Sequence, residues 1–351
     1  MVDRAPQSAE VRRAPFLVTP STAFAAAVLL LLGLLPLLAA WAQQPFYVTL
    51  FTRIMIFALA ALGLNLVLGY GALVSFGHAM YMGVGAYAVG MLSFAGITNG
   101  WAHVGVALLA GALLALAVGA ICLRTSGMAF IMITLAFAQM LFFLAISLKD
   151  FGGDDGLSIA GRSDFGLFKL ADNQALYYAT FGVLLLTLLA CWRLIHSRFG
   201  MVLRGCKSNE RRMGALGFPA LRYKLVAYVL SAQVCVLAGV LLANLTRFVA
   251  PSYMAWTVSG ELIVMVVLGG LGTLMGPVVG AVALLVLEEI LSSFKIGIPA
   301  LDNFVSQHWQ AVIGLFIVFV VLAMKRGIYG MLVARETAQA AASASKNEAP
   351  K

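Results

Sequence analysis

The chain has 351 residues, of which 62% are hydrophobic and only 11% are charged. Soluble globular domains carry about 25% charged residues, so this composition excludes a soluble domain and indicates a polytopic membrane protein. The formal net charge of +9 does not indicate nucleic-acid binding. The basic residues lie in short loops beside apolar segments, where the orientation of a membrane protein accounts for them.

The apolar segments predict an all-α bundle of about ten membrane-spanning helices. Ala40-Trp41-Ala42, after the first segment, resembles a signal-peptidase site. We nevertheless expect this segment to be retained, because it is longer than a signal core and further spans follow at once. The expected spans are 23–40, 47–68, 74–95, 102–122, 127–147, 175–195, 225–245, 257–270, 275–291 and 307–324.

The loop charges predict the orientation. With ten spans both termini lie on one side, and that side then collects 17 lysines and arginines against six on the other. The positive side is cytoplasmic, so we expect an N-in and C-in protein. The predicted domains are a cytoplasmic tail over 1–22, a transmembrane domain over 23–324 with a cytoplasmic loop at 196–224, and a disordered cytoplasmic tail over 325–351.

The acidic, glycine-rich loop before the sixth span resembles a calcium loop only superficially, because the ligand spacing of an EF-hand is missing. We interpret it as a solvated external loop. The four cysteines form no CxxC pair and have no metal-ligand spacing. The sequence therefore predicts no metal site and no cofactor.

Four polar side chains in apolar spans, at Asn65, Ser75, His78 and Glu261, are candidates to line a pathway, with Phe76 beside them. Unpaired polar groups are costly in lipid, so each needs a water-filled route or a polar partner. For His78 the alternative is a packing histidine that is hydrogen-bonded to a neighbouring helix. The glycines of this third span allow another backbone to approach or the helix to break.

A second glycine-rich segment lies between the eighth and ninth spans. Gly272, Gly276 and Gly280 recur every four residues, which would place them on one helix face for close packing. Gly269-Gly270 and Pro277 predict a turn or a broken helix, with Pro277 in the first turn of the ninth span.

The longest polar interval, 193–224, holds eight basic residues and one acidic residue, so it must lie in water on the basic side. Within it, 207–216 predicts a short helix that Ser208 or Asn209 can cap and that Gly217 and Pro219 end. Isolated helices shorter than about 12 residues are marginal in water, so we expect this helix to dock on its own bundle or on a partner.

No Gly-x4-Gly-Lys-Ser/Thr motif occurs, so the chain cannot bind ATP phosphates through a P-loop. No nucleophile or metalloprotease motif occurs either. The sequence therefore indicates a protein that is not an enzyme and has no catalytic residues, and any use of ATP must come from a partner.

Three blocks, at 63–92, 207–241 and 266–281, together resemble the longer permease subunit of bacterial ABC importers of the branched-chain amino acid type. The resemblance implies a multi-pass protein of the inner membrane, a homologous second permease, two cytoplasmic ATPase subunits and a periplasmic binding protein. It also implies that the coupling segment contacts the ATPase. The residues that it assigns to this contact are Asn209, Glu210, Arg211, Ala215, Leu216 and Gly217.

Two alternatives stay open at this point. Relatives of such permeases also carry urea, amides or aromatic carboxylates, and the pathway residues do not decide among these substrates. A secondary transporter of a small polar solute, with Glu261 as its ion-coupled site, is the competing class. A carrier working alone has no reason to possess the coupling segment, and that favours the ABC importer.

Overall fold

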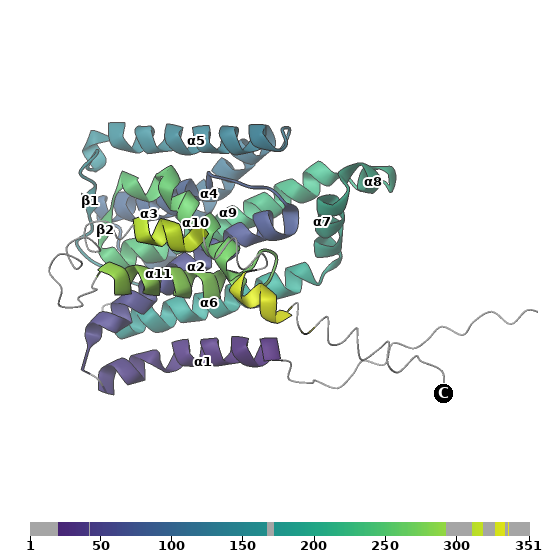
Figure 1. The fold of residues 1–351 in the computed structure, drawn as a ribbon. Helices are drawn as coiled ribbons and strands as arrows, with labels where there is room; N and C mark the ends of the chain where they lie inside the picture. The colour runs from purple at the N-terminus through teal and green to yellow at the C-terminus, as the bar shows by residue number, and fades with distance from the viewer. Residues whose placement is uncertain are drawn as a thin grey trace, which may run out of the picture.

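The computed structural model describes residues 20–41, 43–166, 172–292, 311–318, 327–333 and 336. Most of them are helical, and six helices are long and apolar enough to cross a membrane (Figure 1). The long helices are α1 (Pro20–Trp41), α2 (Pro45–Gly71), α4 (Gly100–Cys122), α5 (Met128–Ser147), α6 (Asn173–Ile195) and α9 (Ala220–Thr246). The shorter ones are α3 (His78–Phe94), α7 (Arg198–Ser208), α8 (Glu210–Ala215), α10 (Trp256–Gly269) and α11 (Gly276–Ser292), with 3-10 turns η1 (Lys149–Phe151) and η2 (Pro251–Met254).

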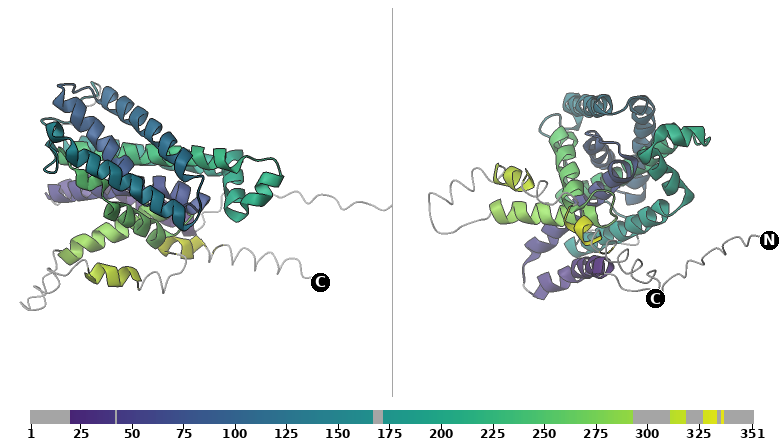
Figure 2. Two further views of the ribbon diagram at one scale, coloured as in Figure 1. Left: turned by 90° about the horizontal axis from the view of Figure 1, so that it is seen from above. Right: turned by 45° about the vertical axis from the view of Figure 1, so that its right-hand side comes forward.

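Helix α2 forms the centre of the bundle. Its most apolar stretch is 94% buried, whereas those of α1 and α5 are each only 22% buried. Helices α1, α6, α9, α10 and α11 all pack against α2, while α3 and α4 pack against the far side of α9. Since the outer helices keep apolar surfaces exposed, they are the ones that face lipid. Helices α7 and α8 project from one end of the bundle (Figures 1 and 2).

The all-α prediction is confirmed, and nine of the ten expected spans correspond to helices. The expected tenth span, 307–324, lies mostly outside the described residues, although 311–318 are helical. Helix α3 begins at His78 instead of residue 74, and residues 72–77 form a non-helical segment before it. Within the expected cytoplasmic tail, residues 328–333 are helical, and the Tyr329 hydroxyl donates to the carbonyl of Ser21 at 3.3 Å.

The non-helical segment between α2 and α3 alternates between buried and partly buried residues after an exposed Ala72, and side chains supply hydrogen bonds to its backbone. The Phe76 amide donates to Thr134 Oγ1 at 3.3 Å, and the Gly77 amide donates to Ser75 Oγ at 3.3 Å. The Ala79 amide, in the first turn of α3, donates to Ser259 Oγ at 3.0 Å. Irregular backbone at membrane depth is tolerated only when such partners are present, so these hydroxyls make the break possible.

Glycines bring α3 and α9 into backbone contact. A β-carbon at Gly85 would lie 2.1 Å from the carbonyl oxygen of Val236, and one at Gly239 would lie 1.8 Å from that of Met82. These contacts are reciprocal, so neither helix could carry a larger residue at its position. The expectation that glycines of the third span admit a neighbouring backbone is thereby confirmed.

The glycine strip expected at 272–280 needs one correction. Gly272 lies in the turn between α10 and α11 with φ of 73°, so only Gly276 and Gly280 share a helix face. Both pack closely against α10: a β-carbon at Gly280 would lie 1.8 Å from the carbonyl oxygen of Met265. The turn itself, and Pro277 in the first turn of α11, are as predicted.

The acidic loop after α5 pairs with the segment after α9, while its aspartates are exposed as expected of a solvated loop. Strand β1 (Leu157–Ser158) pairs antiparallel with β2 (Phe248–Val249), which follows α9. The Arg162 Nε donates to the carbonyl of Asn244 at 3.0 Å. Sequence reasoning did not find this pairing, because each strand has only two residues.

The α3–α9 contact yields a stability prediction. We expect Gly85→Ala to destabilise the protein by about 1–3 kcal/mol, because the added methyl group meets rigid backbone and forces the helices apart. The measurement is the thermal midpoint of the detergent-solubilised chain. Gly105→Ala in α4 is the matched control, since a β-carbon there meets nothing within 4 Å, and it should leave the midpoint unchanged or raise it. Equal midpoints for the two variants would contradict the packing argument.

Candidate functional site

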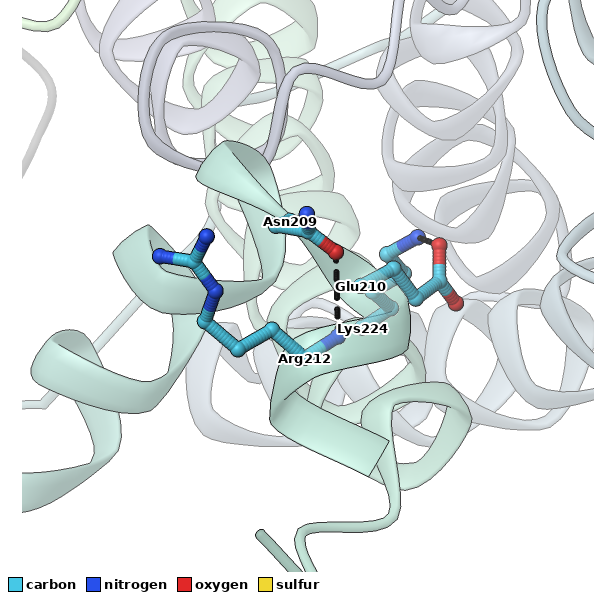
Figure 3. A network of polar contacts seen from close by, with 4 residues as sticks. All are labelled: Asn209, Glu210, Arg212 and Lys224. Carbon is cyan, nitrogen blue, oxygen red and sulfur yellow. Dashed lines mark hydrogen bonds and ion pairs between the residues drawn. The ribbon is translucent and has the colours of Figure 1, made fainter. Parts of the chain in front are cut away.

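The projecting unit of α7 and α8 contains the predicted coupling residues. Asn209 joins the two helices: its amide donates to the carbonyl of Gly205 at 3.0 Å, and its Oδ1 accepts from the Arg212 amide at 3.0 Å (Figure 3). Asn209 therefore ends α7 and caps α8. The expected single helix over 207–216 is wrong in this respect, because the extended backbone of Asn209, with φ of −159°, divides it.

Helix α8 has only six residues, and contacts on one side hold it to the bundle. The Met213 side chain lies against α7, where a β-carbon at Gly205 would come within 2.7 Å of its sulfur. The Lys224 Nζ of α9 forms an ion pair with Glu210 at 2.5 Å (Figure 3). The Lys224 side chain is only 12% exposed, so its position on α9 is fixed by packing, whereas the Glu210 side chain is 53% exposed. The ion pair therefore anchors α8 to α9.

The opposite side of α8 faces solvent. Arg211 and Ala215 are exposed, and Leu216 is 65% exposed even though it belongs to a polar loop. Gly217 follows with φ of 87°, and its amide donates to the carbonyl of Gly214, while the Phe218 amide donates to that of Met213. This is a Schellman ending, which favours glycine at the left-handed position. The helix stop predicted at Gly217 is confirmed.

A chain of polar contacts runs from this unit into the bundle. The Lys207 Nζ donates to the carbonyl of Gly69 at 2.7 Å, near the end of α2. One turn earlier, the Asn65 amide group donates to the carbonyl of Thr273 at 2.8 Å and accepts from the Gly272 amide at 3.1 Å. A β-carbon at Gly69 would lie 2.7 Å from the Gly272 nitrogen. The α10–α11 turn is thus fixed to the same end of α2 that Lys207 holds.

His78, the first residue of α3, is fully buried against α9. Its Nε2 lies 2.8 Å from Ser231 Oγ, and Ser231 donates its only proton to the carbonyl of Gly63 at 2.6 Å. His78 must therefore donate through Nε2–H, which leaves Nδ1 as an acceptor. Among the described residues Nδ1 has no hydrogen-bond partner. Packing accounts for one ring nitrogen and leaves the other unsatisfied, at a cost of about 1–3 kcal/mol.

The predicted pathway residues do not converge on one cavity. Ser75 is fully buried and Phe76 half-buried in the break before α3, where both serve the hydrogen bonds of that break. Asn65 binds the α10–α11 turn, whereas Glu261 is exposed on the first half of α10. In this conformation Asn65 and Ser75 act as structural ligands of irregular backbone.

Sequence reasoning missed the partners of these groups. Thr134, Ser231 and Ser259 each lie in an apolar helix and bond the α2–α3 region, but a single hydroxyl in a span gives no signal of its own. Lys207 was assigned only to the basic loop, although its long side chain reaches α2. No group of His, Cys, Asp and Glu among the described residues is placed to hold a metal ion.

The six membrane-length helices and the non-helical break between α2 and α3 define the chain as a multi-pass membrane protein. It belongs to the family described as "Branched-chain amino acid transport system / permease component", whose sequence model matches residues 46–323. It is accordingly a permease subunit of an ABC importer in the bacterial inner membrane. No solved structure matches the chain.

Relatives include both LivM and LivH permeases. The high-affinity branched-chain amino acid transport system permease protein LivM of Salmonella typhimurium is 28% identical, covering 76% of this chain and 69% of its own length. The corresponding LivH of Escherichia coli is 24% identical, covering 78% of this chain and 91% of its own. The probable branched-chain amino acid transport permease protein LivM of Methanocaldococcus jannaschii is 25% identical, covering 75% of this chain and 88% of its own length. This double relationship supports a second permease as partner.

Gly214 inside α8 and Gly217 just after it provide a matched test of the geometry of this helix. We expect Gly217→Ala to loosen the end of α8 by about 1–2 kcal/mol, because a β-carbon is strained at positive φ. Gly214→Ala, inside the helix with open space around it, should instead stabilise α8 by up to about 1 kcal/mol. Amide hydrogen exchange over 210–218 measures both effects. Equal protection in the two variants would show that the helix stop does not depend on Gly217.

Proposed function

We propose that this permease imports branched-chain amino acids, together with a homologous second permease, two cytoplasmic ATPase subunits and a periplasmic binding protein. The relatives' names support the substrate class. The unit of α7 and α8 supports the ATPase contact, because it is the part of the described chain that projects from the bundle (Figure 1). The proposed contact residues are Asn209, Glu210, Arg211, Ala215, Leu216 and Gly217. The proposed pathway residues are Asn65, Ser75, Phe76, His78 and Glu261.

The exposed face of α8 is the observation that carries this proposal. Leu216, 65% exposed in a loop rich in arginine, offers an apolar anchor with a basic surround. Interfaces of this kind concentrate their binding energy in a few such anchors. Glu210 has a second role, since its ion pair with Lys224 sets the orientation of α8.

The contacts between α7 and α2 give a route for coupling. Closure of the ATPases would move α8, and Lys207 would transmit that movement to the end of α2 through the Gly69 carbonyl. The α10–α11 turn follows, because Asn65 and the close approach of Gly69 and Gly272 fix it to α2. We infer that α7, the end of α2 and the α10–α11 turn move as one body.

Replacing the anchor tests the docking surface. We expect Leu216→Asp to weaken binding of the ATPase subunits by at least about 2 kcal/mol, or about thirtyfold in affinity, because it places a carboxylate in an apolar contact. The measurement is co-purification of the ATPases with the permease. Ile97→Asp is the control, since Ile97 is an exposed aliphatic residue after α3 that has no part in the proposed contact. Undiminished co-purification of Leu216→Asp would contradict the assignment of α8.

Replacing Lys207 tests the route. We expect Lys207→Met to leave assembly and ATP hydrolysis intact but to lower amino-acid uptake, because the loss of a charge-assisted hydrogen bond frees α7 from α2. The measurement is the ratio of the amino-acid uptake rate to the ATPase rate in proteoliposomes. Arg204→Met is the control: Arg204 also lies on α7, but it bonds the carbonyls of Gly200 and Ile195 and not α2. An equal loss in both variants, or in neither, would refute the route through Gly69.

A further inference from the structure

The first half of α2 and the last turns of α11 line a groove. In the ribbon, these parts of the two helices lie at the end of the bundle away from α7 and α8 (Figure 1). One half of the groove is charged and has a volume of about 190 Å³. Arg53 and Ile54 line it from α2, and Glu288 and Ser292 line it from α11. Both signs of charge therefore face the same small space.

The other half of the groove is mostly apolar and larger, at about 400 Å³. Its walls include Phe46 and Phe51 from α2 and Val286 and Ile290 from α11. Leu50 and Glu289 line both halves, so they form one continuous groove with a carboxylate at its junction. The larger half alone falls within the range of about 300–1,000 Å³ that small-molecule sites occupy.

The charges of Arg53, Glu261 and Glu288 are close to one another but not paired. No ion pair joins Arg53 to Glu261 or Glu288 among the described residues, although Arg53 interacts electrostatically with both. Arg53 and Glu261 are exposed and Glu288 is half-buried. The Cζ of Arg53 lies 5.7 Å from the centroid of the Phe57 ring. These charged groups are therefore accessible to a polar ligand.

We propose that this groove binds a hydrophobic amino acid as its zwitterion on the way through the membrane. The guanidinium of Arg53 suits a carboxylate, which it can bind through two parallel hydrogen bonds. Glu288, with Glu261 of α10 within electrostatic reach, suits the ammonium group. The apolar half then takes the branched aliphatic side chain. This inference rests on the proposed function and gives it a location.

The arrangement favours an amino acid over an anionic lipid. Among the described residues, Arg53 is the one basic residue that lines either half of the groove, and Glu288 and Glu289 line its charged half. Two carboxylates would repel an anionic headgroup. A zwitterion instead needs one cation and an anion a few ångströms apart beside an apolar surface, and the groove supplies all three.

The test is protection of a thiol placed in the charged half. Ser292→Cys is labelled with a water-soluble thiol reagent in the assembled transporter, where the four native cysteines are buried. We expect L-leucine at about ten times its dissociation constant to slow labelling about tenfold, and L-glutamate to give no protection. Arg53→Gln should weaken the effect of L-leucine about ten- to hundredfold, because it removes a charge-assisted contact. Arg247→Gln, which removes an arginine outside the groove, should leave it unchanged.

Three results would overturn the inference. L-leucine uptake without protection of the introduced thiol would place the substrate elsewhere and leave the proposed function standing. Protection that follows assembly with the second permease, independent of L-leucine, would assign the groove to a subunit contact. Labelling that responds to added phospholipid vesicles and not to amino acids would assign it to lipid. If the unsubstituted transporter imports no amino acid, the proposed function fails, and labelling alone then decides whether the groove binds L-leucine.

Discussion

The contact of backbone with backbone between α3 and α9 is the constraint on which this fold depends. The hydrophobic effect does not drive helices together in lipid, so close packing must supply the energy of association. At Gly85 and Gly239 the two helices lie so close that neither position has room for a β-carbon. That approach buries the start of α3, where the backbone is not helical and where Ser75, Thr134 and Ser259 must supply hydrogen bonds. The core is therefore held by small residues and polar contacts.

Close packing and polar contacts also connect the unit of α7 and α8 to the interior of the bundle. Helix α8 is too short to be stable alone, so α7 and α9 hold it through Met213 and the ion pair of Glu210. Helix α7 in turn reaches the end of α2 through Lys207. Asn65 fixes the α10–α11 turn to that same end, so a force on α8 has a short and rigid path to helices in the centre of the bundle.

Much of the fold was predictable from sequence, because membrane spans, the capping Asn209 and the glycine stop at Gly217 depend on local chemistry. The tertiary contacts could not be predicted from the sequence. The partners of His78 and Asn65 come from helices far along the chain, and the division of the coupling segment at Asn209 depends on how α8 packs against α7. The grouping of Arg53 with Glu288 likewise needs α2 and α11 side by side.

The central claim is that the unit of α7 and α8 and the α10–α11 turn move together. Spin labels at Arg212 in α8 and Leu271 in the turn, both exposed, test it in the assembled transporter lacking the native cysteines. Pulsed electron resonance should give the same distance between Arg212 and Leu271 with and without trapped ATP, while the distance from Arg212 to Met128, at the start of α5, changes. A distance from Arg212 to Leu271 that changes as much as the distance to Met128 would contradict the account.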